Sequence, residues 1–443
     1  MAATDRRVGP ADRLGGHPER SEGSLRGPAD RLGGHPERSE GSLRGPADRL
    51  GVHPERSEGS PRSATCHPER SKGSRRWPPR NPFGFFAWLI GVVGSLLAHG
   101  HAHAVDLPED KAETLFHSYS GGGVTALGPA VLIRKSILDK VSLSGTYYMD
   151  AVSNASIDVV TTASKYHEVR NEFGLSADYV YRDSQITLSG LTSHEPDYIA
   201  NTGSLDISQE VFGGMTTVAL GFTRGADRVL KHNAPEFSDS VRHWQYRLGA
   251  TQILTPRWLM SANLEALSDD GYLGSPYRFA RVFGAAVPER NPRTRSARAI
   301  KFRLVGDLGS RDAMHVEYRY YRDTWAIKAH TAELGYSRYF GKEWLADTFV
   351  RYYTQTHAVF YSDNAPTEST YVSRNRQLST FSDASLGAKL AYTVKKVPGK
   401  YDLKLNGSYE FTHFSFKDFT DIRTGSLYGY NANIVQVFLT ATY

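Results

Sequence analysis

The 443-residue chain has one cysteine, Cys66, and all of the sequence after it is free of thiols. This excludes structural disulfides, cysteine-ligated zinc or iron–sulfur clusters and thiol nucleophiles from that part of the chain. Proline is scarce as well, since only 10 of the 21 prolines fall in residues 105–443. No run of about 20 apolar residues follows residue 104, so the sequence predicts no helical membrane domain.

A strong excess of one charge is also missing once the chain is divided at residue 80. Residues 1–80 hold 16 of the 53 Lys and Arg and 11 of the 47 Asp and Glu, which leaves 37 basic and 36 acidic residues in 81–443. The formal net charge of +6 therefore comes mostly from the first 80 residues. Because nucleic-acid binding needs a basic face on the folded part, the sequence predicts no nucleic-acid partner.

Residues 1–80 consist largely of an 18-residue repeat. Copies at residues 9–26, 27–44 and 45–62 read GPADRLGGHPERSEGSLR with few changes, and a partial copy starts at His67. The unit has one or two leucines and no aromatic residue, so it can neither offset its chain entropy by burial nor stack as a solenoid. We expect this segment to be disordered. Translated repetitive DNA ahead of the true start would give the same pattern.

A secretory signal peptide is predicted at residues 81–104. Basic residues precede an apolar, uncharged stretch at residues 83–98, and the small-residue site Ala102-His103-Ala104 follows it. This order is typical of export, whereas the alternative, a single transmembrane anchor, needs a longer apolar run. Cleavage after Ala104 would leave residues 105–443 as the mature, exported chain.

The pattern of residues 105–443 is that of a strand-rich protein, with 46 of the 51 aromatic residues of the chain. Apolar and polar residues alternate with a period of two at residues 173–182, 244–251, 300–307, 401–412 and 435–443. Strands of about ten residues with one apolar face are typical of outer-membrane barrels, whereas soluble sandwiches and propellers use shorter strands. The sequence therefore predicts an all-β protein, a transmembrane antiparallel β-barrel of the bacterial outer membrane.

Short and long connections alternate along the predicted barrel. Short turns fall near residues 138–140, 183–184, 213–214, 255–257, 309–311, 341–343 and 397–400. Longer polar segments lie near residues 151–171, 225–241, 268–296, 355–379 and 413–430, and shorter links near 194–202 and 322–327. Seven hairpins, a first strand at residues 112–120 and a last strand at residues 432–443 give 16 strands, which leaves room for an aqueous channel. Counts of 14 to 18 stay open, because the first strand and residues 205–211 are weakly patterned.

Charged residues share the polar face of these strands. A lipid-facing Arg or Lys near the bilayer centre costs about 2–4 kcal/mol, so the polar face is expected to line the lumen. The lumen-facing candidates are Arg247, Lys301, Arg303, Glu317, Arg319 and Arg351. Two interpretations stay open, namely cross-strand ion pairs that stiffen a wet wall and a ring of one charge at one height.

Aromatic residues cluster toward both ends of the predicted strands, which predicts two interfacial girdles. The long-loop end has Tyr318, Tyr320, Tyr321, Trp325, Tyr352 and Tyr353, and the short-turn end has Trp258, Tyr339, Phe340 and Trp344. A platform on which bases or sugars stack is the alternative.

The segment at residues 268–296 is rich in arginine. It carries Arg278, Arg281, Arg290, Arg293 and Arg295 among tyrosines and phenylalanines. The segment is long enough to fold into the lumen as a constriction that favours small anionic solutes. The alternative is an outward loop that contacts lipopolysaccharide phosphates.

The templates of soluble enzymes are absent from residues 105–443. These residues contain no glycine-rich phosphate loop after a strand, no HExxH and no GxSxG motif. Histidines near loop ends, at His194, His243, His357 and His413, are the candidates for a barrel hydrolase. The sequence predicts no enzyme, no cofactor, and no catalytic, cofactor-binding or metal-binding residues.

Several strings between residues 118 and 443 resemble a family of bacterial outer-membrane barrels that is classed only as a domain of unknown function. The matching strings are SNASIDVVTT at 153–162, YRLGATQILT at 246–255, DGYLGSPYR at 270–278, PRTR at 292–295, YRYYRDTW at 318–325, ELGY at 333–336 and RYYTQTHAVFYSD at 351–363. The resemblance implies the barrel and its location but no activity. It also implies the company of small lipoproteins and flavin-transfer enzymes, and hence an envelope redox or flavin context.

These observations favour a porin-like channel for small solutes. A membrane anchor or scaffold for a periplasmic or lipoprotein partner complex is the second hypothesis, and a barrel hydrolase is the third. The expected partners are outer-membrane lipids and lipopolysaccharide, with a possible periplasmic protein. The barrel-assembly machinery joins them because the alternating last strand ends on Tyr443, which resembles the signal that machinery reads.

Overall fold

The computed structural model of the protein describes residues 105–154, 166–232 and 234–443. The predicted repeats at residues 1–80 and the predicted signal peptide at residues 81–104 lie outside the described residues. In the described part, no helix is long and apolar enough to cross a membrane.

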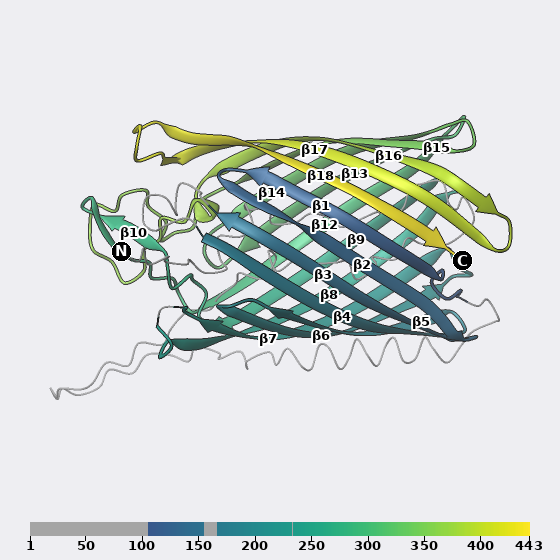
Figure 1. Ribbon diagram of the computed structural model, residues 1–443, viewed down its shortest axis with the longest axis horizontal. Coiled ribbons are helices and arrows are strands. Elements are labelled where there is room, and N and C mark those ends of the chain that lie inside the picture. The colour runs from purple at the N-terminus through teal and green to yellow at the C-terminus, as the bar shows by residue number, and fades with distance from the viewer. Residues whose placement is uncertain (1–104, 155–165, 233) are drawn as a thin grey trace, which may run out of the picture.

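Sixteen antiparallel strands form a closed barrel (Figure 1). They are β1 (Lys111–Gly121), β2 (Val124–Leu138), β3 (Val141–Asn154), β4 (Tyr166–Tyr181), β5 (Ser184–His194), β6 (Tyr198–Val211), β7 (Thr216–Leu230), β8 (Ser238–Thr255), β9 (Trp258–Gly271), β12 (Thr294–Gly309), β13 (Asp312–Asp323), β14 (Lys328–Phe340), β15 (Trp344–Gln355), β16 (Phe381–Val397), β17 (Tyr401–Thr420) and β18 (Leu427–Thr442). Each strand pairs with its sequence neighbours in the barrel, and β1 pairs with β18 to close it.

Two further strands and a short 3₁₀ helix lie in the connections. The strands β10 (Phe279–Val282) and β11 (Ala285–Pro288) form a separate hairpin between β9 and β12. The helix η3 (Arg376–Leu378) lies between β15 and β16. The predicted all-β fold and the count of 16 strands are confirmed.

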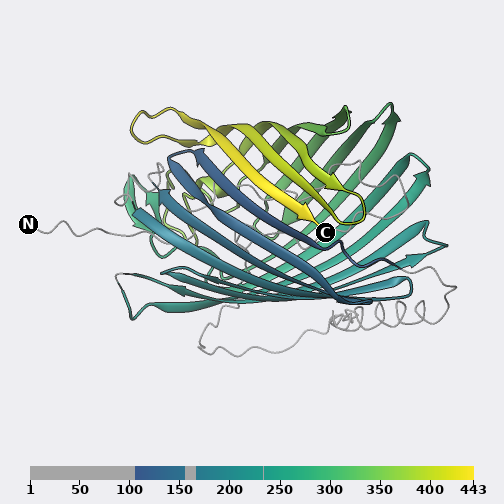
Figure 2. The same ribbon diagram turned by 45° about the vertical axis from the view of Figure 1, so that its right-hand side comes forward.

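The seven predicted short turns all lie at one end of the barrel, which we call the turn side. The C-terminus is at this end too, where the Tyr443 amide donates to the Asp110 carbonyl at 3.0 Å. The long connections lie at the opposite end, the loop side (Figure 2). Because short turns face the periplasm in such barrels, the loop side faces outward from the cell.

Several strands are longer than the sequence pattern predicted. The segment predicted as a loop at residues 413–430 is strand up to Thr420 and again from Leu427, so its loop shrinks to residues 421–426. The strands continue beyond the apolar band of the barrel. Polar and aromatic residues therefore replace the alternation of apolar and polar residues in these extensions.

Alternation along each strand separates an apolar outer face from a polar inner one. On β4, Phe173 and Leu175 point outward and are 53% and 74% exposed, whereas Arg170, Glu172 and Asp178 are buried on the inside. Exposed large apolar side chains recur at outward positions around the barrel. A closed barrel with such a band belongs in the outer membrane, which confirms the predicted location.

Replacing Leu175 with arginine tests this assignment of faces. We expect the free energy of unfolding in lipid vesicles to fall by about 2–4 kcal/mol, because the charge would enter the bilayer. The matched control is Ser176→Arg at the neighbouring inward position, for which we expect a much smaller loss. Equal losses for the two variants in urea titrations would contradict the orientation of β4.

The predicted aromatic girdles need a correction. Tyr318 and Tyr352 do face outward, with exposed fractions of 41% and 52%. Tyr353 and Trp325, in contrast, are buried in a cluster inside the loop-side end, and Tyr321 packs against it. Adjacent residues on a strand point to opposite faces, so runs such as Tyr320-Tyr321 and Tyr352-Tyr353 cannot both belong to one girdle.

Candidate functional site: the barrel interior and its loop-side mouth

The six residues predicted to face the lumen lie on the inner face, and each has a partner of opposite charge. Arg247 pairs with Asp206 at 2.6 Å, across the intervening strand β7. The inward residue of β7 between them is Gly221, where a β-carbon would come within 2.4 Å of the Asp206 carboxylate and 2.6 Å of Arg247 Nε. The absence of a side chain at Gly221 therefore makes room for this ion pair.

Similar pairs continue around the wall. Glu317 lies between Lys301 at 2.6 Å and Arg303 at 2.8 Å. Arg319 pairs with Glu265 at 2.8 Å. Arg351 pairs with Glu410 at 2.7 Å, and its guanidinium also donates to Ser385. The two signs are thus mixed along the wall, and these six residues do not form a ring of one charge.

One set of side chains in this wall could offer ligands to a metal ion. His315, Glu317 and Glu333 have ligand atoms within 4.8 Å of one another. His315 Nε2 is 3.1 Å from Glu333, and Glu317 is engaged by Lys301 and Arg303. A divalent cation would have to displace both cations from Glu317, so the electrostatics oppose this set as a metal site.

Arg170 is the centre of a buried charge network at the loop-side mouth. Its guanidinium lies 3.2 Å from Asp150, 2.5 Å from Glu172 and 3.8 Å from Glu195. Its side chain is 3% exposed, and Asp150 also bonds His117 at 2.7 Å. Since one arginine balances several buried carboxylates, the network depends on Arg170 for its charge balance.

Buried carboxylates are numerous on this part of the interior. Buried carboxylates of β3–β9 and the β5–β6 turn at the mouth are Asp150, Glu168, Glu172, Glu195, Asp197, Asp227 and Asp269. The same strands bring Arg170 and His243 to the mouth, and further basic side chains reach it from other elements, namely His117 from β1, Arg278 from residues 272–293 and Arg295 from β12. His243 bonds both Asp227, at 3.0 Å, and Asp269, at 2.8 Å. We call these seven carboxylates the acidic mouth.

The connection between β9 and β12, residues 272–293, leans over the acidic mouth. It begins at Gly271, whose φ of 135° suits glycine, and a β-carbon there would lie 2.0 Å from the Ser240 carbonyl oxygen. Farther along, Tyr277 donates its hydroxyl to Asp197 at 2.8 Å and accepts the His232 amide at 2.6 Å. Tyr277 therefore ties this loop to the β5–β6 and β7–β8 connections.

Burial raises the pKa of the Tyr277 phenol above its ordinary value, and the hydrogen bond to the Asp197 carboxylate adds to this effect. The His232 amide, which donates to the phenol oxygen, acts in the opposite direction but is outweighed. The hydroxyl thus keeps its proton at neutral pH and remains a donor to Asp197.

We expect Tyr277→Phe to loosen this loop. The variant loses a hydrogen bond to a charged group, which is worth about 1.5–3 kcal/mol, so tryptic cleavage between residues 281 and 293 should become about tenfold faster or more. Tyr272→Phe is the matched control. The Tyr272 ring packs against Phe237, and this packing stays in place when the substitution removes the hydroxyl. Identical cleavage rates in the two variants would argue against the tie.

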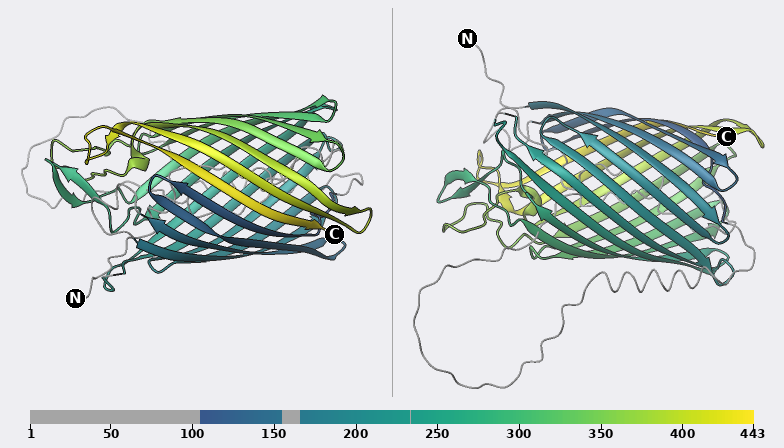
Figure 3. Two further views of the ribbon diagram at one scale, coloured as in Figure 1. Left: turned by 45° about the horizontal axis from the view of Figure 1, so that its top comes forward. Right: turned by 90° about the horizontal axis from the view of Figure 1, so that it is seen from below.

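A second connection, residues 356–380 between β15 and β16, joins the first. Val282 pairs with Ala365, and Arg290 pairs with Val372 through backbone hydrogen bonds of 3.0 and 2.9 Å. Arg290 also forms an ion pair with Glu368. We call the two connections the joined loops. Figure 3 shows them gathered at the loop-side end of the barrel.

The joined loops also reach the opposite wall. Arg376 Nη1 lies 3.5 Å from the Gly122 carbonyl in the β1–β2 turn. Arg374 pairs with Asp363 at 2.6 Å and lies 4.3 Å from the centre of the Phe419 ring. Together with Tyr277, these contacts connect the β5–β6 turn to the β1–β2 turn across the mouth.

An apolar cluster inside the loop-side end supports the joined loops. Its buried members include Leu273 and Leu378 from the loops, and Trp325, Phe381, Phe414 and Phe419 from the β13–β14 connection and the wall. Phe381 is 2% exposed and Phe419 is fully buried. The loops are therefore packed into the mouth and narrow it.

The five arginines predicted to form a constriction are distributed over several elements. Arg278 is buried in the first joined loop, and Arg281 lies half-buried on β10. Arg293 makes two hydrogen bonds of 2.7 Å to Asp239. Arg295 faces the interior from β12 and pairs with Asp323 at 2.5 Å. Arg290, Arg293 and Arg295 thus each pair with a carboxylate, and the predicted bias toward anions stays a prediction.

The four rim histidines do not converge. His243 is inside, between two aspartates. His357 of the second joined loop contacts Asp418 on β17 at 2.8 Å and the Thr380 hydroxyl at 3.1 Å, both through Nδ1. His194 and His413 are exposed; His194 bonds Thr192, and His413 bonds Asn431 and Ser415. Within the described residues, none of these four histidines uses one ring nitrogen for a carboxylate and the other for a hydroxyl, as a nucleophilic site requires.

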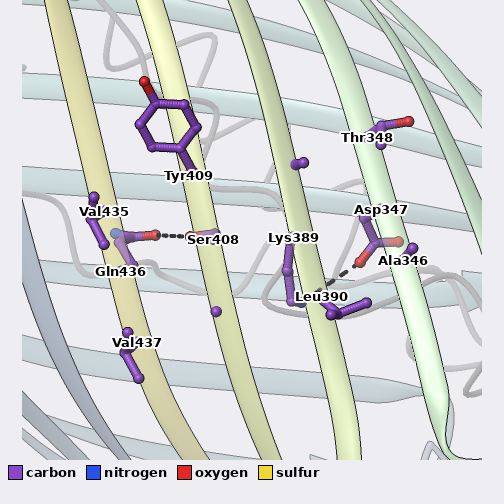
Figure 4. A pocket seen from close by; sticks show the side chains of 12 residues that line it. Ala346, Asp347, Thr348, Lys389, Leu390, Ser408, Tyr409, Val435, Gln436 and Val437 are labelled. Atoms are coloured by element: carbon purple, nitrogen blue, oxygen red, sulfur yellow. Dashed lines mark hydrogen bonds and ion pairs between the residues drawn. The ribbon is translucent and has the colours of Figure 1, made fainter.

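A hollow of about 400 Å³ lies in the wall formed by β15–β18 (Figure 4). Its lining comes from both faces of the wall, and a β-carbon at Gly407 would meet open space. The polar residues there already contact each other, Lys389 with Asp347 at 3.9 Å and Ser408 with Gln436 at 3.3 Å. The hollow therefore presents no convergent donors for a ligand.

Sequence reasoning missed the second joined loop and the role of Arg170. Residues 355–379 were predicted only as a long polar segment. A signal was present in Phe381, Phe414 and Phe416, which are aromatic at positions of inward parity. Large apolar side chains on the polar face of a barrel indicate that something packs against them from inside.

A closed 16-strand antiparallel barrel with an apolar outer band and a charged inner wall defines a bacterial outer-membrane β-barrel protein. Residues 112–410 match the family described as "Protein of unknown function (DUF3570)", and the chain belongs to this family. The resemblance noted in the sequence is thereby confirmed. No curated protein is significantly similar to the sequence.

Solved outer-membrane proteins are similar in fold at low identity. The siderophore receptor PirA from Pseudomonas aeruginosa is 7% identical with a TM-score of 0.40, and the match covers 71% of this chain and 60% of the receptor. A FadL homologue from the same species is 12% identical with a TM-score of 0.36, covering 76% and 90%. The outer membrane protein opdK from Pseudomonas aeruginosa is 10% identical with a TM-score of 0.36, and the match covers 75% of this chain and 99% of opdK. A further similar structure is titled as the CymD monoaromatic hydrocarbon channel, with 10% identity and a TM-score of 0.39, covering 76% of this chain and 89% of that one.

Proposed function

We propose that the protein is an outer-membrane channel for small solutes whose outer mouth is narrowed by the joined loops. The observation that carries this proposal is the closed 16-strand wall with ion pairs on its inner face. A barrel of this size leaves an aqueous interior. The backbone hydrogen bonds between the joined loops lie at the loop-side end of the barrel, so the joined loops act on the mouth.

The acidic mouth favours cations over anions. A solute that enters from outside passes the joined loops next to seven buried carboxylates, with Arg170, His243 and Arg278 of the first joined loop as buried cations beside them. Charged side chains at a narrow section set the sign of ions that pass. The proposed channel therefore prefers small cationic or neutral solutes, in contrast to the anionic preference that the arginine-rich segment suggested.

Planar-bilayer recording of the purified protein tests both parts of the proposal. We expect stable single-channel currents, and a reversal potential in a salt gradient that has the sign of cation selectivity. Cation selectivity should fall when Glu168 and Asp197 are replaced by glutamine and asparagine. Anion selectivity would overturn the proposed preference. No current at all, together with a periplasmic protein that copurifies, would favour the anchor hypothesis instead.

A further inference from the structure

Three cations lie side by side on the outer face of the barrel. Arg298, Arg322 and Lys328 occupy directly opposed register positions on β12, β13 and β14. All three side chains are exposed and have the outward parity of their strands. Directly opposed residues have β-carbons about 4.5–5.5 Å apart, so the three charges form a continuous row. We call it the cation row.

The cation row has no carboxylate of its own. Other outward or turn-side cations are paired, Arg242 with Asp270 at 3.1 Å, Arg338 with Asp312 at 3.4 Å and Lys135 with Asp110 at 2.6 Å. Across the described ranges, no ion pair joins a member of the row to an acidic residue. The residues that flank the row are Ala266 on β9 and Thr356, which directly follows β15. Like charges in opposed positions destabilise a sheet, so the row calls for an external anion.

The height of the cation row identifies where that anion is. The next outward positions toward the bilayer are Ile300, Tyr320 and His330, which are two residues, or about 6.6 Å, farther along the tilted strands. Farther in are Phe302 and Tyr318, which continue the outer band. Tyrosines at this depth are typical of the boundary between headgroups and acyl chains. The row therefore lies at the headgroup level of the outer leaflet.

Hydroxyl groups complete the surface above the row. Ser296 and Thr324 lie on the loop side of Arg298 and Arg322, and the Ser296 amide donates to Thr324 Oγ1 at 3.0 Å. Arginine guanidinium groups bind phosphate through two parallel hydrogen bonds, and hydroxyls bind sugars. Cations at the headgroup level, hydroxyls above and an apolar face below match a lipid whose headgroup combines phosphate and sugar.

We propose that the cation row binds the phosphate groups of a lipid A-type glycolipid in the outer leaflet. The guanidinium groups of Arg298 and Arg322 and the ammonium of Lys328 hold the phosphates. The acyl chains lie along the outward face of β12 and β13, over Ile300 and Phe302. The site is independent of the channel interior, because these residues face away from it.

The test is a titration of full-length protein in detergent micelles with a fluorescent, bisphosphorylated lipid A. The variant Arg298→Gln/Arg322→Gln/Lys328→Gln should bind roughly 100-fold more weakly than the unchanged protein. The matched control is Arg257→Gln/Lys342→Gln/Lys400→Gln, which removes the same charge from exposed turn-side residues and should bind like the unchanged protein. Dephosphorylated lipid A should bind the unchanged protein about as weakly as bisphosphorylated lipid A binds the row variant.

Equal affinity of the unchanged protein and the row variant would overturn the proposal, as would equal affinity for the dephosphorylated lipid. Displacement of the lipid by millimolar inorganic phosphate would also overturn it, since the site would then be one for free phosphate. Heat-modifiable migration on gels reports whether each variant is folded. If the triple variant does not fold, Arg322→Gln removes the central cation alone and should weaken binding about fivefold.

Discussion

Replacing residues 364–372 with three glycines is expected to raise the single-channel conductance at least about twofold, because the narrowest section of a channel limits its current. The exchange removes Asn364, Ala365, Glu368 and Val372, which make most of the contacts of the second joined loop with the first, and leaves the hydrogen bond from Ser373 to Glu289. Ser362 and Ser373 are already adjacent, with a backbone hydrogen bond of 2.9 Å, so a short linker can join the remaining ends. Arg374 and Arg376 keep their places on the wall.

The control for this exchange is a shortening of the β17–β18 connection, with residues 422–425 replaced by two glycines. That connection lies outside the joined loops, so we expect the single-channel conductance of this variant to match that of the unchanged protein. A loop exchange that leaves conductance and open probability unchanged would show that the joined loops do not limit passage. This result would contradict the proposed role of the joined loops at the mouth without contradicting the barrel fold.

The second large effect is expected for Arg170→Met, which should lower the free energy of unfolding by about 3–5 kcal/mol. The methionine fills part of the space but leaves Asp150, Glu172 and Glu195 buried without their common cation. Urea unfolding in detergent, followed by tryptophan fluorescence, measures the change. Arg170→Lys should recover part of the loss, because it restores the charge without the geometry of the guanidinium.

Arg247→Met is the matched control for Arg170→Met. Its ion pair with Asp206 has side chains that are 23% and 40% exposed, so solvent screens it and the expected loss is about 1 kcal/mol or less. Comparable losses at the two positions would contradict the view that the mouth network, rather than the mid-wall pairs, depends on one buried cation.

Most of the fold could be predicted from local alternation. The seven tight turns and the parity argument gave the strand count, because both depend only on neighbouring residues and on the rule that short turns lie at one end. The weakly patterned first strand was confirmed as β1. Its backbone is held by hydrogen bonds to β18, which close the barrel and do not depend on an alternating side-chain pattern. Strand ends beyond the apolar band were underestimated, since alternation there loses its apolar half.

The site was less predictable because its contacts are distant in sequence. Arg170 and Glu195 meet across β4 and β5, and Tyr277 reaches Asp197, 80 residues earlier in the chain. Period-two alternation predicts that Arg247 and Arg319 point inward. Their pairing with Asp206 and Glu265 depends in addition on the strand register around the barrel. Likewise, the cation row is visible only once the register places Arg298 beside Arg322 and Lys328.

The central claim is that one face of the wall lines an aqueous lumen while the other contacts lipid, and single cysteines on β8 test it most directly. Cys66 is the only native thiol, so Cys66→Ser gives a thiol-free background. Cysteines at positions 245 to 250, placed one at a time, are treated in outer membranes with a charged, membrane-impermeant thiol reagent. The account predicts reaction at 245, 247 and 249 and protection at 246, 248 and 250. Uniform reaction along β8, or protection at all six positions, would contradict it.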